Sequence, residues 1–295
     1  QVNYIELIRG TSGDLDVRGS AQVVNVVLFE ELSDSSVSYE ANMDRYRDGK
    51  NQPGGSITYS SKIGNLDFVL GAVAEPRYSH SESDEYSILG DFSPNDIVRE
   101  DRITDQLSRD LSANLEYEIN AKNSARFNAL YSENDNPTDL FRQTSDLTTT
   151  PNSLLSERED IPGERDNWEI GGDYEYISEQ GSRFKVLFIS NQDNRTATRE
   201  RYEIAADGSE TKNLFLDSSS TFEEQIIRGS YTFDIFENQD IEFGAERAQT
   251  TLDSNLALGL SDTTGIPSPD YGGLVPDAIS NANSTVKEIR YEPFA

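Results

Sequence analysis

The sequence contains no cysteine, one histidine, one methionine and one tryptophan among its 295 residues. Without cysteine, disulfide frameworks, thiolate metal sites and cysteine nucleophiles are excluded. Cationic residues are also scarce, because 25 lysines and arginines stand against 54 acids and leave a formal net charge of −29. This balance excludes a nucleic-acid binder that works through a basic face, since binding to phosphates depends on Lys and Arg.

Long apolar runs are missing too. The nearest approach is residues 68–74, far shorter than the ~18 residues of a membrane-spanning helix. Apolar residues make up 35% of the chain, below the roughly 45–50% of a soluble globular domain. These values are compatible with a membrane β-barrel, because its strands present only every second side chain to lipid.

Few side chains are available for catalysis or metal binding. His80 is the only histidine and has no cysteine partner, so we expect a solvated loop histidine that does not anchor a metal by itself. A catalytic triad would have to use His80, and no nucleophile elbow accompanies it. Residues 14–19 resemble the start of a calcium loop, but Arg18 stands where a ligand oxygen is required. We therefore expect no enzyme activity, no metal and no cofactor.

The dominant pattern from Val37 onward is an alternation with a period of two. In residues 37–44 every odd position is apolar or small and every even position is polar. Such alternation predicts strands with one apolar and one polar face. The same pattern recurs in residues 56–59, 66–72, 111–119, 125–131, 168–176, 184–188, 228–233 and 240–245.

The connections between these strands alternate between short and long. Four short ones begin at residues 62, 120, 178 and 236, each 58 residues after the one before. Strands of about 10–12 residues exceed the usual 5–6, and Tyr, Phe and Trp gather near the strand ends, which favours an outer-membrane barrel over a β-sandwich. We expect the long acidic segments to be loops, the third with a hairpin at its middle: residues 75–106, 133–167, 193–221 and 251–285.

The first thirty residues do not fit a barrel strand. They predict a strand at residues 4–8, a Gly-rich stretch to Gly19 and a buried strand at Val23–Leu28. The informative residues are Ile5-Glu6-Leu7-Ile8-Arg9-Gly10, Gly19 and Val23-Val24-Asn25-Val26-Val27. This stretch, followed by barrel-like strands, resembles the end of the plug domain in TonB-dependent outer-membrane receptors. Thr11 replaces the family's common Pro, and Val17-Arg18-Gly19 replaces its usual Tyr-Gly, which leaves the subfamily open.

The resemblance implies a fold and a function. Residues 1–31 would end a small α+β plug domain, and residues 32–295 would form the first ten or so strands of an antiparallel transmembrane β-barrel of about 22 strands. We expect the chain to be an internal piece of a longer protein. The family takes up scarce ligands across the bacterial outer membrane, most often ferric siderophores, with oligosaccharide, cobalamin or haem as alternatives.

The implied partners are of three kinds. The TonB complex of the inner membrane would supply energy through a contact segment outside this chain. Outer-membrane lipid and lipopolysaccharide would surround the barrel. A small-molecule or oligosaccharide ligand would be the cargo, and no nucleic acid is expected.

Two groups of candidate residues follow from this interpretation. The plug motif would dock the plug to the barrel wall or gate the lumen, where its arginines need carboxylate partners. Its members are Glu6, Arg9, Gly10, Asp14, Asp16, Arg18, Gly19 and Asn25. Aromatic and cationic residues of the long segments are candidates for ligand contact: Phe92, Phe141, Arg142, Tyr202, Phe215 and Tyr271.

Two other function classes stay open. A passive, porin-like channel without a plug would leave residues 1–31 packed outside the lumen. A secreted, acidic, β-rich adhesin would be water-soluble, and its loops would stiffen on adding calcium.

Overall fold

The computed structural model describes residues 2–8, 23–28, 35–236, 239–280 and 282–295. Within these ranges the only helical turn is the 3-10 helix η1 (Pro269–Tyr271). The strands of the main sheet are β3 (Ser36–Arg45), β4 (Asn51–Ile63), β5 (Leu66–Ile88), β6 (Pro94–Asn120), β7 (Asn123–Asp135), β8 (Thr138–Asp146), β9 (Ser153–Ile161), β10 (Gly163–Ile177), β11 (Arg183–Ile204), β12 (Glu210–Phe236), β13 (Gln239–Leu260), β14 (Val275–Asp277) and β15 (Ser284–Phe294).

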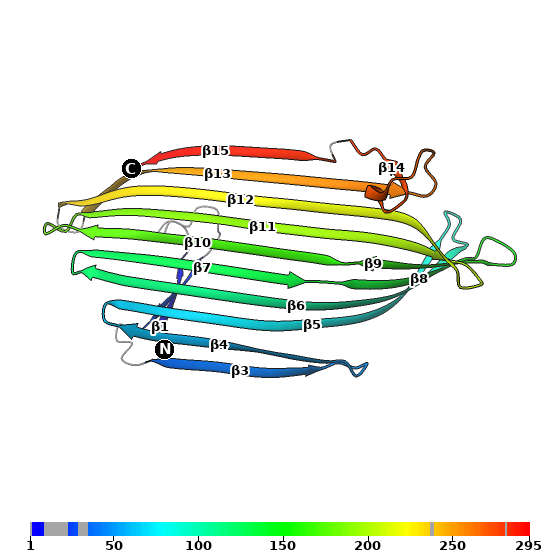
Figure 1. The fold of residues 1–295 in the computed structure, drawn as a ribbon, viewed down its shortest axis with the longest axis horizontal. Coiled ribbons are helices and arrows are strands. Elements are labelled where there is room, and N and C mark those ends of the chain that lie inside the picture. Colours follow the sequence, from blue (N-terminus) through cyan, green and yellow to red (C-terminus); the bar gives the residue numbers. More distant parts are fainter. Residues whose placement is uncertain (1, 9–22, 29–34, 237–238, 281) are drawn as a thin grey trace.

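These thirteen strands form one antiparallel sheet (Figure 1). Neighbours along the chain are mostly neighbours in the sheet, from β3 at one edge to β14 and β15 at the other. β8 continues the line of β7, β9 leads into β10, and β14 and β15 pair with successive parts of β13. The sheet therefore has ten rows. The expected all-β, antiparallel architecture is confirmed.

Two prolines interrupt the middle rows without shifting them. The register in which β6 pairs with β7 continues unchanged where β6 pairs with β8. The register in which β11 pairs with β10 likewise continues unchanged where β11 pairs with β9. Pro137 and Pro162 occupy facing positions there. Because neither has an N–H, the ladder between them stops. Their carbonyls still accept hydrogen bonds from the backbone N–H groups of Asp105 and Thr198, each at 3.1 Å.

The apolar residues of the alternating segments share one face of the sheet. Register partners place Leu70 beside Ala113, Ala113 beside Ala129 and Ala129 beside Ile170. We call this surface the apolar face. Its larger members include Tyr39, Ile57, Tyr59, Phe68, Leu70, Leu111, Leu115, Phe127, Tyr131, Trp168, Ile170, Tyr174, Phe184, Phe188, Ile227, Tyr231 and Phe243.

The main sheet is a single layer and has almost no core of its own. Among the described residues, the only buried apolar side chains larger than glycine are Pro76, Leu140 and Ala248. On the apolar face Leu111 is 57% exposed and Tyr39 is 80% exposed. Sheets in soluble domains bury such a face against another layer. This sheet instead presents a broad apolar surface to its surroundings.

The short turns lie where the sequence places them. Residues 64–65, 121–122 and 178–182 join β4 to β5, β6 to β7 and β10 to β11 at one end of the sheet, on the left in Figure 1. Gly64 and Gly181 adopt φ values of 62° and 88°, which glycine reaches without a steric penalty. The fourth turn lies outside the described residues, at 237–238. β3 and β4 are also joined by a short turn, at the opposite end.

Three of the four expected long loops, residues 75–106, 133–167 and 193–221, are mostly strand, so the prediction is wrong for these three. β5 runs to Ile88 and β6 starts at Pro94, which makes residues 75–106 a hairpin with a tight tip. The hairpin around Asp207 and Gly208 is confirmed at the tip of β11 and β12. β6 and β12 reach 27 residues, more than twice the expected length. Between β13 and β15 most residues lie outside strands, with η1 and β14 among them.

The N-terminal segment contains a second, two-stranded sheet. β1 (Val2–Ile8) and β2 (Val23–Leu28) pair antiparallel, with Glu6 opposite Asn25. The two strands expected here are therefore confirmed. The other plug-motif residues, Arg9, Gly10, Asp14, Asp16, Arg18 and Gly19, lie outside the described residues. No helix in the described part of the chain is long and apolar enough to cross a membrane.

Candidate functional site

Polar strands extend well beyond the apolar face at the end opposite the short turns. We call residues 75–106, 138–161 and 194–221 the polar extension. It is built from β5, β6, β8, β9, β11 and β12, and it contains all the sequence-derived ligand candidates except Tyr271. Because the strands stay in register, charged residues far apart in sequence are brought side by side.

One face of the polar extension carries a network of arginines and glutamates. Arg199 donates two hydrogen bonds to the carboxylate of Glu159, at 2.6 and 2.8 Å. Arg142 lies 3.6 Å from the same carboxylate and 2.9 Å from Glu100. The Glu159 side chain has no exposed surface, and a buried carboxylate of this kind requires charged partners. Two arginines on neighbouring strands supply them.

The network continues on both sides of this centre. Glu100 also accepts a bond from Arg102 at 3.1 Å, and Glu157 lies 3.3 Å from Arg201. Burial raises the pKa of Glu100, but the hydrogen bonds from Arg142 and Arg102 outweigh it and leave the pKa below its ordinary value. The arginine–glutamate network comprises Glu100, Arg102, Arg142, Glu157, Glu159, Arg199 and Arg201.

An aromatic cluster lies at the outer end of β11 and β12. The Arg158 guanidinium lies 4.1 Å from the Tyr202 ring centre, and Lys212 lies 5.5 and 5.9 Å from the rings of Tyr202 and Phe215. Cations over aromatic faces are held by the ring quadrupole. Lys212 also donates to the backbone carbonyl of Gly272 at 3.4 Å. The Phe215 ring faces the same glycine.

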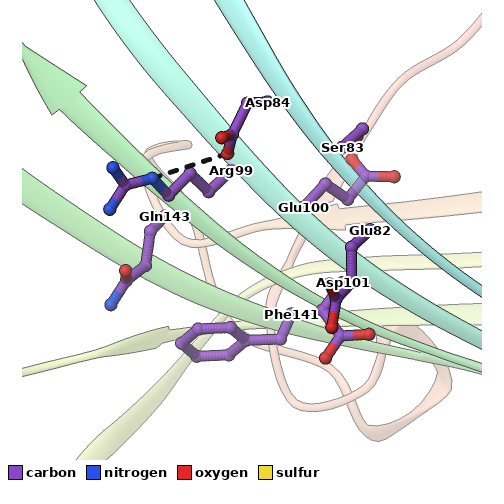
Figure 2. Close-up of a pocket in the computed structure, with 8 residues that line it drawn as sticks. All are labelled: Glu82, Ser83, Asp84, Arg99, Glu100, Asp101, Phe141 and Gln143. Atoms are coloured by element: carbon purple, nitrogen blue, oxygen red, sulfur yellow. Dashed lines mark ion pairs between the residues drawn. The ribbon is translucent and has the colours of Figure 1, made fainter. Parts of the chain in front are cut away.

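The opposite face of the polar extension has a pocket of about 380 Å³ (Figure 2). Phe141 and Gln143 of β8 line it together with Glu82 and Asp84 of β5 and residues 99–101 of β6. Arg99 and Asp84 form an ion pair at 3.5 Å, marked in Figure 2. The pocket is a polar hollow with one aromatic wall.

The structure divides the ligand candidates among separate places. Arg142 belongs to the network, while its neighbour Phe141 points to the other face and lines the pocket. Phe92 is 82% exposed at the tip of the β5–β6 hairpin, with a positive φ of 67°. Tyr202 and Phe215 both lie near Lys212 in the aromatic cluster, and Tyr271 directly precedes Gly272 in sequence.

His80 is exposed, as expected, but it does not lie in a loop. His80 lies within β5, and its Nε2 is 2.7 Å from Asp101 of the paired strand β6. Glu82 and Asp48 lie 3.9 and 3.5 Å from the same ring. The hydrogen bond to Asp101 and the surrounding negative charge raise the pKa of His80 above its ordinary 6.5.

Sequence reasoning missed most of the network, although a signal was present. Residues 157–159 read Glu-Arg-Glu and residues 199–201 read Arg-Glu-Arg. On strands, charges that alternate in sign place like charges on one face. Here residues 157–159 place glutamates on one face and residues 199–201 place arginines on one face. If the two segments pair so that these faces coincide, ion pairs like those in the structure are predicted.

No protein-family model matches the chain, and no curated protein is significantly similar to it. The functional proposal therefore rests on the sheet, its two faces and the N-terminal motif.

Proposed function

We propose that this chain is part of a TonB-dependent receptor that takes up a scarce ligand across the bacterial outer membrane. The main sheet would be one side of a transmembrane barrel, and residues 1–31 would be the end of the plug. Lipid would cover the apolar face, and the polar extension would stand outside the cell. Transport of this kind needs no covalent chemistry by the chain.

The uncovered apolar face carries the proposal. It spans about nine residues along each strand, from Trp168 to Tyr176 on β10 for example. At about 3.3 Å per residue and a tilt near 40°, nine residues cover roughly 23 Å. That height fits the apolar band of roughly 25 Å in outer-membrane barrels. Aliphatic side chains lie near its middle and Tyr and Trp near its edges, as in an aromatic girdle.

The two ends of the sheet support an orientation. Outer-membrane barrels have short periplasmic turns and long extracellular connections. Short turns join the rows at one end of this sheet, and apart from the short β3–β4 turn the connections at the other end are longer polar hairpins and the β13–β15 segment. The short turns would therefore face the periplasm. The plug-like motif at the N-terminus precedes the first row, in the order found in TonB-dependent receptors.

The proposed ligand class is based on the ligands that TonB-dependent receptors commonly transport and on one feature of the polar extension. Ferric siderophores are the first candidates, with oligosaccharide, cobalamin and haem as alternatives. The arginine–glutamate network places four guanidinium groups among three carboxylates. Each guanidinium has five N–H donors, so the network keeps donors for the oxygen atoms of a ligand.

The first experiment is on the native, longer protein to which this chain would belong, which we call the parent protein, in isolated outer membranes. An antibody to this segment would detect it on SDS gels of heated and unheated samples. We expect a membrane-bound band whose mobility shifts on heating, because a closed barrel resists SDS until it is heated. A water-soluble protein with no shift would contradict both the barrel and the receptor, and would favour the acidic adhesin.

Ligand binding is tested separately by calorimetry on the purified protein. Ferric chelates and glycans are the two probes. We expect heat release with ferric chelates, weakened when Arg142 is replaced by Gln. Binding to glycans alone would reassign the cargo to the oligosaccharide class.

A further inference from the structure

The single histidine lies between carboxylates from three segments of the chain. His80 and Glu82 stand on the same face of β5, and Glu82 is the direct register partner of Asp101 on β6. Two carboxylates at directly opposed positions repel each other. Figure 2 shows the carboxylate ends of Glu82 and Asp101 converging at the pocket. A pair of this kind is stabilised by a cation placed between its members.

The histidine ring is oriented as metal-binding histidines are. Its Nε2 faces Asp101 at 2.7 Å and Glu82 at 3.9 Å, while its Nδ1 faces Asp48 at 3.5 Å. Asp48 is itself held by the Tyr78 hydroxyl and by the backbone N–H of Lys50. Histidines that bind metals commonly donate their second ring N–H to a carboxylate, which fixes the ring and its tautomer.

We propose that His80, Glu82 and Asp101 form a binding site for a divalent transition metal such as Zn²⁺, with Asp48 as the positioning residue for His80. One imidazole nitrogen and two carboxylate oxygens are ligands that Zn²⁺ accepts, and water would complete a four-coordinate site. Ca²⁺ and Mg²⁺ prefer sets made only of oxygen atoms. The proposal does not depend on the receptor function.

The geometry needs only small movements to close around an ion. One ligand atom from each of the three residues lies within 4.8 Å of the others. Glu82 is 80% exposed at its side chain and can rotate freely. On binding, the proton that Nε2 shares with Asp101 leaves to solvent, and the freed nitrogen lone pair goes to the metal. Nδ1 keeps its proton, on the side of the ring that faces Asp48 at 3.5 Å.

The test measures Zn²⁺ binding to the folded parent protein after treatment with a chelator. Competition with a zinc-sensitive dye gives stoichiometry and affinity. We expect one site, and a loss of affinity of at least tenfold in His80→Gln. Asp48→Asn should weaken binding roughly tenfold without removing a ligand, as changes to second-layer carboxylates do.

Asp84→Asn is the matched control. Asp84 lies on the same face of β5 and pairs with Arg99, so the variant removes one negative charge close to the site without touching it. Its affinity should equal that of the parent. The site would be overturned if Asp84→Asn lost as much affinity for Zn²⁺ as Asp48→Asn. It would also be overturned if the unsubstituted protein bound Zn²⁺ no more tightly than the His80→Gln variant. Displacement of Zn²⁺ by equimolar Ca²⁺ would overturn the transition-metal assignment. Circular dichroism shows that each variant is folded.

Discussion

At the scale of single residues, His80 has a charge that depends on its neighbours. Asp101, Glu82 and Asp48 surround it and favour the imidazolium form, so we expect its pKa to exceed 6.5. Because the pKa of His80 is higher in the folded than in the unfolded state, protonation of His80 stabilises the fold. This stabilisation is fully present below the unfolded pKa near 6.5 and is lost as the pH rises through the folded pKa. NMR titration of the His80 ring, with chelator present, measures the midpoint.

Asp101→Asn is the informative variant for this titration. It removes the strongest hydrogen-bond partner of the ring, so the midpoint should fall toward 6.5. His80→Gln identifies the signal. A parent midpoint at or below 6.5 would show that the carboxylates do not act on the ring as the structure indicates.

The buried ion pair of Glu159 gives a second prediction, on the stability of the fold. At pH 7, Arg199→Gln should lower the free energy of unfolding by about 2–3 kcal/mol. Breaking a fully buried pair costs about 3–5 kcal/mol, but Arg199 is 40% exposed and Arg142 remains 3.6 Å from Glu159. Urea unfolding measures the difference. The double variant with Glu159→Gln should recover most of the loss, because no unpaired buried charge is left.

At the scale of the strand, β6 offers two adjacent positions on opposite faces. Leu115 lies on the apolar face between Phe68 and Phe127, and Asn114 lies on the other. If lipid covers the apolar face, Leu115→Arg should destabilise the folded protein by about 2–4 kcal/mol. Asn114→Arg should change it little. Urea unfolding in lipid vesicles compares them, and equal effects would place both faces in water.

Alternation made the strands near the short turns predictable. An apolar residue at every second position is a strong signal, as in residues 111–119. The polar extension carries polar side chains on both faces, so it lacks this signal and its sequence predicts loop. Its backbone nevertheless needs hydrogen-bond partners, and continuing the ladder supplies them.

The contacts of the candidate sites could not be predicted in the same way. His80 meets Asp101 only because the β5–β6 hairpin turns at residues 89–93, and it meets Asp48 only through the β3–β4 turn. A different turn position would shift every pairing. Alternating charges in residues 157–159 and 199–201 indicated the ion pairs, but which segments pair depends on the whole row order.

At the scale of the whole molecule, the main sheet ends in two edges that pair with no other described strand. β3 is at one end of the row order, and β14 and β15 are at the other. Backbone groups on an open edge have no partner in lipid and promote association with other chains. The proposed barrel would complete both edges with further strands.

We therefore expect this chain, expressed without any additional sequence, to associate into heterogeneous aggregates in detergent. Size-exclusion chromatography measures this. If further strands pair both edges, as the proposed barrel requires, the longer protein should elute as one species. A monodisperse, heat-resistant product from the 295-residue chain would show that the edges are satisfied without further strands.

The unbroken register through Pro137 and Pro162 restricts how these hairpins can change in length. Removing two residues from each arm of a hairpin shortens it and leaves every remaining side chain on its original face. Removing one residue from each arm moves every side chain beyond the deletion to the other face of the sheet. The guanidinium groups of the network would then exchange faces with the acidic side chains on the opposite face. Insertions and deletions that preserve this surface are therefore confined to even steps in each arm.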